Sequence, residues 1–68
     1  MFKPITSEIT LKTGMILQEI GSGSEFKLGL KLNDGSDRWH IKEVGNPNAN
    51  DLILDRQTLS MKYFVEED

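Results

Sequence analysis

The sequence predicts an all-β domain, built as a small five-stranded antiparallel barrel or as one strongly twisted sheet. Two observations favour this fold: segments in which apolar and polar residues alternate, and turn-forming residues that recur between them at short intervals. A third is that no long stretch has the 3.6-residue period of an amphipathic helix. We expect only one short helical turn, over residues 55–58, directly before the last strand.

The clearest strand covers residues 25–32 and leads into a hairpin. Every second side chain in it is apolar and is expected on the core face: Phe26, Leu28, Leu30 and Leu32. Asp34 and Gly35 follow, and Asp-Gly between two strand-like runs predicts a tight turn in which Gly35 has positive φ. The chain then returns over residues 37–44, with Trp39 and Ile41 directed into the core. The alternation breaks at Glu43, which predicts a bulge or the end of the strand there.

The remaining strands are predicted on either side of this hairpin. Residues 15–20 precede it, with a short additional strand at 9–11, and residues 52–54 follow it after a polar loop over 45–51. The last strand covers 59–65, and its alternation is expected to bury four side chains: Leu59, Met61, Tyr63 and Val65.

This order of strands, with a short turn before the last one, resembles the SH3-like small barrels. The resemblance covers residues 12–65 and is carried by residues 11–14, the strand of Trp39 and the crossover at 52–59. It is a likeness of architecture alone, and it implies no particular activity because such folds host unrelated functions.

The length of the chain predicts a single domain over residues 1–68. A chain of 68 residues buries only about 60% of its unfolded surface, which leaves no material for a second core. The ends, residues 1–8 and 66–68, are expected to be loosely ordered. There is no cysteine, so neither a disulfide nor a thiolate metal site reinforces this small core.

Composition excludes several classes of function. The net charge of −3 argues against coating nucleic acid by bulk charge. No apolar run approaches the roughly 20 residues that cross a bilayer, so no membrane association is expected and the predicted location is the cytoplasm. His40 is the sole histidine, and without cysteine the usual catalytic pairs and metal clusters cannot be assembled. We therefore expect no enzymatic activity, no cofactor and no metal.

The hairpin nevertheless predicts a binding face. A turn centred on Asp34 and Gly35 would pair Leu30 with Trp39 and would gather basic side chains on the opposite, outer face of the sheet. These predicted binding residues are Lys27, Lys31, Arg38, His40 and Lys42. Phe64 is added as an exposed aromatic side chain, unless it packs beneath Phe2 or Ile5. The alternative interpretation is that the basic side chains extend into water and protect an exposed sheet from aggregation.

The sequence is compatible with two functions. The first is a non-catalytic protein-interaction module of a small regulatory or accessory protein, of bacterial or phage type, whose partner has an acidic surface. The alternative is a nucleic-acid-binding module that uses the basic hairpin face. Salt dependence of binding to oligonucleotides separates the two, because phosphate contacts release counterions.

Overall fold

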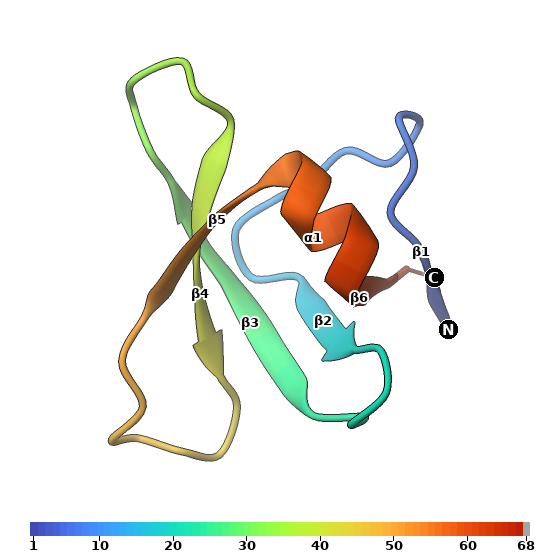
Figure 1. The fold of residues 1–68 in the computed structure, drawn as a ribbon, viewed down its shortest axis with the longest axis vertical. Helices are drawn as coiled ribbons and strands as arrows, with labels where there is room; N and C mark the ends of the chain where they lie inside the picture. Colours follow the sequence, from blue (N-terminus) through green and yellow to red (C-terminus); the bar gives the residue numbers. More distant parts are fainter. Residues whose placement is uncertain (68) are drawn as a thin grey trace.

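The computed structural model describes residues 1–67, and strands form most of its regular structure (Figure 1). The elements in chain order are β1 (Phe2–Pro4), β2 (Ile16–Glu19), β3 (Glu25–Lys31), β4 (Arg38–Glu43), β5 (Leu52–Asp55), α1 (Arg56–Lys62) and β6 (Tyr63–Glu66). The strands form one antiparallel sheet in the order β1-β6-β2-β3-β4-β5. The all-β prediction is thereby confirmed at the level of a small antiparallel domain.

The predicted five-stranded barrel is wrong in two respects: the sheet has six strands and it does not close. The additional strand is β1, which pairs with β6 and forms one edge of the sheet. The other edge is β5, which runs directly into α1 instead of turning to meet β1 (Figure 1). Because this helix covers the core side of the sheet, the apolar face is protected without closure.

The core lies between the curved sheet, the helix and the segment that follows β1. Its buried side chains are Ile5, Leu11, Leu17, Leu28, Trp39, Ile41, Leu59, Tyr63 and Val65. Trp39 is 7% exposed, which confirms its predicted core position. Phe26 packs edge-to-face on Tyr63 with the ring centroids 5.3 Å apart. Residues 9–11, a predicted strand, belong to no strand, although Leu11 still contributes to the core.

The β3–β4 hairpin departs from the predicted register near its turn. Lys27 pairs with Lys42 as predicted, but closer to the turn Lys31, instead of Leu30, is opposite Trp39. The connection is a five-residue loop over 33–37, closed by a 2.8 Å hydrogen bond from the Leu32 N–H to the Arg38 carbonyl. This loop shifts the pairing by one residue, and the sheet absorbs the shift in a bulge between Leu28 and Lys31.

The bulge therefore lies at Gly29 and Leu30 and not at Glu43, where β4 continues in register opposite Phe26. Leu30 was predicted in the core, but it is 71% exposed. A glycine inside a strand is the sequence signal for such a bulge. A β-carbon at Gly29 would lie only 3.2 Å from the His40 carbonyl oxygen, so the two strands approach each other closely at this point.

The helix is longer than the predicted single turn. Asp55 caps it, since its carboxylate accepts a 2.8 Å hydrogen bond from the Thr58 N–H. Helical periodicity then continues through residues that were predicted as strand: Leu59 stays buried, whereas Met61 is 70% exposed. The last strand consequently begins at Tyr63, four residues later than predicted.

The two ends of the described chain lie next to each other (Figure 1). The N-terminal ammonium is 2.6 Å from the Glu66 carboxylate, and Lys3 is 3.7 Å from that of Glu67. Ile5, within the segment predicted to be loose, is buried in the core. Asp68, part of the other predicted loose end, lies outside the described residues.

Candidate functional site

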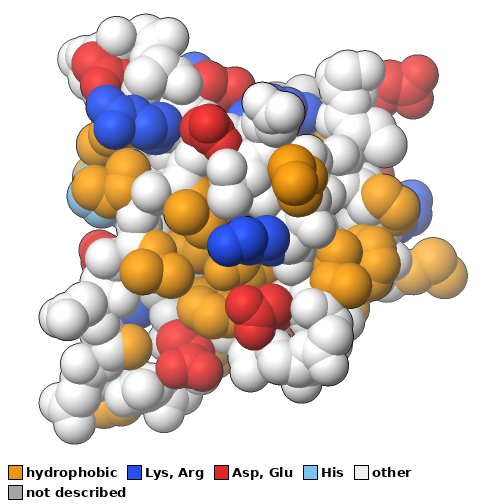
Figure 2. Space-filling model, viewed as in Figure 1, with side chains coloured by type: hydrophobic (Ala, Val, Ile, Leu, Met, Phe, Trp, Pro, Cys, Tyr) orange, Lys and Arg blue, Asp and Glu red, His pale blue; other side chains and the backbone are white. Residues whose placement is uncertain are grey.

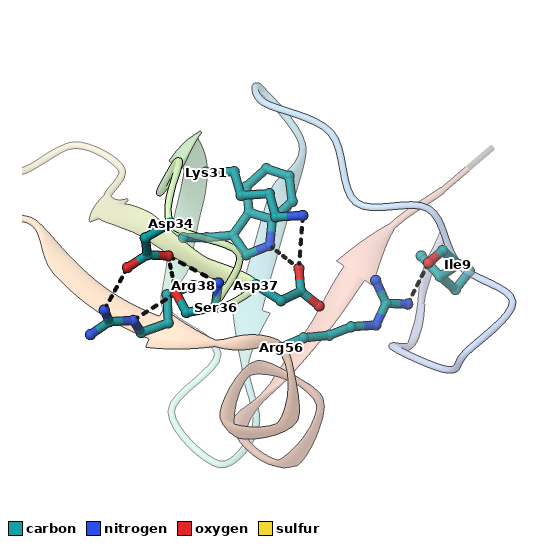
Figure 3. A network of polar contacts seen from close by, with 8 residues as sticks. Ile9, Lys31, Asp34, Ser36, Asp37, Arg38 and Arg56 are labelled. Atoms are coloured by element: carbon teal, nitrogen blue, oxygen red, sulfur yellow. Dashed lines mark hydrogen bonds and ion pairs between the residues drawn. The ribbon is translucent and has the colours of Figure 1, made fainter.

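The predicted basic face is not assembled as one patch, because the bulge moves Lys31 to the other side of the sheet. Opposite Trp39, the Lys31 ammonium lies 6.0 Å from the centre of the indole ring and 3.5 Å from the Asp37 carboxylate. The same carboxylate accepts a 3.3 Å hydrogen bond from the Trp39 indole N–H (Figure 3). Lys31 thus belongs to a small polar cluster over the tryptophan ring.

Arg38 remains on the outer face, but its charge is already partnered. Its guanidinium donates a 2.9 Å hydrogen bond to the Asp34 carboxylate and another of 2.9 Å to the Ser36 hydroxyl (Figure 3). Hydrogen bonds from the Ser36 side chain and backbone, and then from Arg38, lower the pKa of Asp34 to about 2. These contacts fold the loop back on itself, and the charge of Arg38 is already paired with that of Asp34.

Two other basic residues of the predicted face do lie together. Lys27 and Lys42 are direct cross-strand partners, and both are exposed. Within residues 1–67, neither ammonium has a carboxylate within ion-pairing distance. On the side of the molecule that carries α1, Figure 2 shows basic side chains in separate places among acidic and apolar ones.

Phe64 lies apart from the other predicted binding residues. It is half-buried in β6, with Gln18 of β2 and Pro4 of β1 as its cross-strand partners. Strand β2 separates it from Lys27 and Lys31 of β3, and strands β2 and β3 separate it from the β4 residues in the sheet. Phe64 and the basic residues therefore do not form a common site.

A different group of residues lies together around the bulge. A shallow hollow beside it is lined by Gly29, Leu30, His40 and Asp51. Ile53 of β5 is the cross-strand partner of His40, so its side chain lies on the same outer face, and it is 47% exposed. We call these five residues the bulge patch.

His40 is the polar centre of the bulge patch. Its Nδ1 atom is buried and has no hydrogen-bond partner among the described residues. The closest acidic group is the Asp51 carboxylate, whose Oδ2 atom is 3.8 Å from this nitrogen, beyond hydrogen-bonding distance. A buried polar atom without a partner is uncommon in folded proteins, which makes His40 a candidate functional residue.

Sequence reasoning identified His40 but missed its apolar neighbours. Leu30 was assigned to the core because strict alternation was assumed through Gly29. Ile53 was placed in a short, wholly apolar strand whose alternation gives no information about which side chain faces outward. The glycine in the strand interior was the one available signal for the exposed leucine.

The described residues contain no group of three or more His, Cys, Asp or Glu side chains that could hold a metal ion. In residues 1–67, no helix is long and apolar enough to cross a membrane. Comparison with protein-family models, curated proteins and solved structures finds no match for this chain.

Proposed function

We propose that this domain is a non-catalytic module that binds another protein chain through the bulge patch. The observation that carries the proposal is the placement of two exposed apolar side chains, Leu30 and Ile53, on either side of His40 on the outer face. Single exposed leucines are ordinary on folded proteins, whereas several exposed apolar side chains grouped around a polar one are typical of interaction surfaces.

The local backbone supports this proposal. The bulge exposes Leu30, which regular pairing would have placed opposite Trp39 in the core, and bulges occur where a strand must redirect a side chain. The proposal includes a regulatory or accessory role. It also includes an SH3-like arrangement in the form of an open sheet, which the short helix before the last strand supports. The lack of cysteine fits a cytoplasmic location.

The test compares the same substitution at two apolar side chains of similar size and exposure. Leu30→Lys changes the bulge patch at a side chain that is 71% exposed, and Met61→Lys makes the same change on α1 at a side chain that is 70% exposed. Both variants should fold as the wild type does, judged by circular dichroism. Proteins cross-linked to the wild-type domain in its source cells should be retained by Met61→Lys and lost by Leu30→Lys. Equal recovery by both variants would refute the role of the bulge patch.

A nucleic-acid-binding function keeps one supporting observation, the exposed pair Lys27 and Lys42 without acidic partners. Two phosphate contacts to duplex DNA would give a slope of roughly −1.8 for log affinity against log salt, at about 0.9 per contact. Fluorescence anisotropy with mixed-sequence oligonucleotides measures this slope. Binding that has this slope and is lost in a Lys27→Glu, Lys42→Glu variant would favour this alternative over the protein-binding function.

A further inference from the structure

Strand β5 presents an unpaired edge of the sheet. It is the last strand in the order β1-β6-β2-β3-β4-β5, and in residues 1–67 no strand pairs with β5 on the side away from β4. Both Leu52 and Ile53 are 47% exposed. An exposed, apolar edge strand offers a row of backbone donors and acceptors to which another extended chain can add.

The hydrogen-bond pattern shows which backbone groups are free at this edge. The Arg38 carbonyl accepts from the Leu32 N–H, so Arg38 directs its backbone groups toward β3. Because these directions alternate along an antiparallel strand, Trp39 directs its groups toward β5 and bonds with its partner Leu54. By the same alternation, the N–H and C=O of Ile53 face the open edge.

The opposite edge of the sheet lacks this feature. Strand β1 has three residues, one of which is Pro4, and proline has no N–H to donate. Its Lys3 carries a charge, a common protection of edge strands. In contrast, β5 contains neither proline nor lysine, so the two edges differ in their capacity to accept another strand.

The side chains along the open edge have a distinct charge pattern. Ile53 and Asp55 lie on the outer face of β5, and Asp51, two residues before Ile53, lines the hollow on that face. A hydrogen bond from Thr58 holds the pKa of Asp55 below its usual value, so this side chain is ionised at neutral pH. Side chains along this edge are therefore acidic, apolar and acidic in turn, at intervals of two residues, which is the spacing of side chains on one face of a strand.

This pattern disfavours a second copy of the chain as the occupant. Two β5 strands paired about Ile53 would place Asp51 opposite Asp55 of the other copy, and like charges directly opposite each other destabilise a sheet. A strand with basic side chains at these two positions is complementary. Arg38 lies opposite Asp55 within the sheet, but its guanidinium is bound to Asp34 at 2.9 Å.

We propose that the occupant of the bulge patch is an extended segment of another protein that adds as a strand to the open edge of β5. The segment has the pattern basic–x–apolar–x–basic, with the apolar residue opposite Ile53 and the basic residues opposite Asp51 and Asp55. The pattern is symmetric, so it serves a segment of either direction. This inference rests on the proposed function and specifies the chemistry of the partner.

A random library of linear heptapeptides displayed on phage and selected on the immobilised full chain provides the first test. We expect enriched peptides to carry Lys or Arg at two positions four residues apart, with an apolar, preferably β-branched residue midway. Enrichment of another pattern, or no enrichment, would overturn the inference. The proposed function would still stand if Leu30→Lys, but not Met61→Lys, loses its cross-linked protein partner.

The second test uses the most enriched peptide and distinguishes strand addition from side-chain docking. N-methylation of alternate residues removes the donors on one side of the bound strand and should reduce affinity at least about tenfold, since several backbone hydrogen bonds are lost together and the methyl groups also block approach. N-methylation of the intervening residues should have much less effect. Equal effects of the two patterns would overturn strand addition.

The third test addresses the charges. Asp51→Lys should weaken binding of this peptide by about threefold or more, because an attractive cross-strand pair becomes repulsive. Glu25→Lys makes the same charge change at an exposed residue of β3, which β4 separates from β5, and should leave affinity within twofold because exposed charges at a distance contribute little. Equal weakening by both variants would mean that only net charge matters, and the assigned position of the basic residues would be wrong.

Discussion

At the scale of single residues, the environment of Trp39 joins the core to the polar hairpin loop. One face of the indole packs in the core, while its N–H reaches the Asp37 carboxylate and the Lys31 ammonium lies over the ring. Large aromatic side chains dominate the energetics of small cores. Trp39 was predictable from alternation, whereas its partners depend on the bulge and were not.

We predict that Trp39→Ala leaves most of the domain unfolded at ambient temperature. Removing a core aromatic costs about 3 to 5 kcal/mol, whereas a chain of 68 residues at the lower end of the usual range, about 0.05 kcal/mol per residue, has a stability of only about 3 kcal/mol. Circular dichroism and the dispersion of NMR amide signals measure the folded fraction. A variant that melts cooperatively at nearly the wild-type temperature would contradict the prediction.

A second prediction at this scale concerns Asp34. Its pKa is about 2 in the folded chain, below the value of about 3.9 in an unfolded chain, so its contribution to stability is present above pH 4. That contribution disappears as the pH falls from about 4 to about 2, because the carboxylate is then protonated in the folded state too. We expect Asp34→Asn to melt at a lower temperature than wild type near pH 6.

The melting temperatures of the two proteins should converge between about pH 4 and pH 2, where wild type loses the contribution that the variant already lacks. Thermal unfolding followed by circular dichroism over this range measures the difference. A difference that stays constant over the whole range would show that the stabilising effect of Asp34 does not depend on its ionisation.

At the scale of elements, the hairpin shows where sequence reasoning succeeds and where it fails. Both strands and the positive φ of Gly35, +77°, were predicted from alternation and turn chemistry. The loop, however, has five residues, and Asp37 also adopts a positive φ of 56°. Hydrogen bonds from Ser36 to Asp34 stabilise this longer loop, and such side-chain contacts are not visible in the pattern of apolar residues.

We predict that Gly35→Val destabilises the domain by about 1 to 2 kcal/mol without disturbing the core. No atom lies within 4 Å of a β-carbon placed at this position, so the effect comes from the backbone conformation alone, which a β-branched residue strongly disfavours. Urea unfolding gives the free energy. Gly35→Asn is the control and should lose less, since asparagine tolerates positive φ. Equal stability of the glycine and valine proteins would be inconsistent with the loop conformation.

The helix illustrates a second limit of the sequence. Leu59 and Tyr63 are four residues apart, a spacing that suits a helix, while both also fit the period of two through Met61. The Asp55 cap decides between them, because its hydrogen bond to the Thr58 N–H begins a helix that continues to Lys62. An aspartate three residues before a threonine is a weak signal when read without the structure.

At the scale of the whole molecule, the composition predicted one small β domain, but the topology depended on contacts between distant segments. Arg56 donates hydrogen bonds to the carbonyls of Thr6 and Ile9, which ties the helix to the segment after β1. Figure 3 shows the bond to Ile9. This contact and the pairing of β1 with β6 join the two ends of the sequence. They explain why a sixth strand forms and why local patterns did not reveal it.

The site follows the same division between local and distant determinants. The basic residues were chosen from a register that holds at Lys27 and Lys42 and fails at Lys31. The bulge patch combines β3, β4, β5 and the loop before β5, so its composition follows only from the arrangement of the sheet. An edge strand cannot be identified until the order of strands is known.

The last prediction links the small size of the molecule to binding. A ligand that binds only the folded chain stabilises it by about 2.7 kcal/mol at a concentration of 100 times its dissociation constant. For a domain of this size, 1 kcal/mol corresponds to about 4 to 8 °C in melting temperature. The enriched peptide should therefore raise the melting temperature by about 10 °C or more at that concentration. The Ile53→Lys variant should show a much smaller rise, because this side chain lies opposite the apolar residue of the bound peptide. Met61→Lys should respond as wild type does, because its substitution lies on α1, away from the open edge of β5. If the peptide shifts all three proteins equally, it binds elsewhere on the domain, and the edge of β5 is not its binding surface.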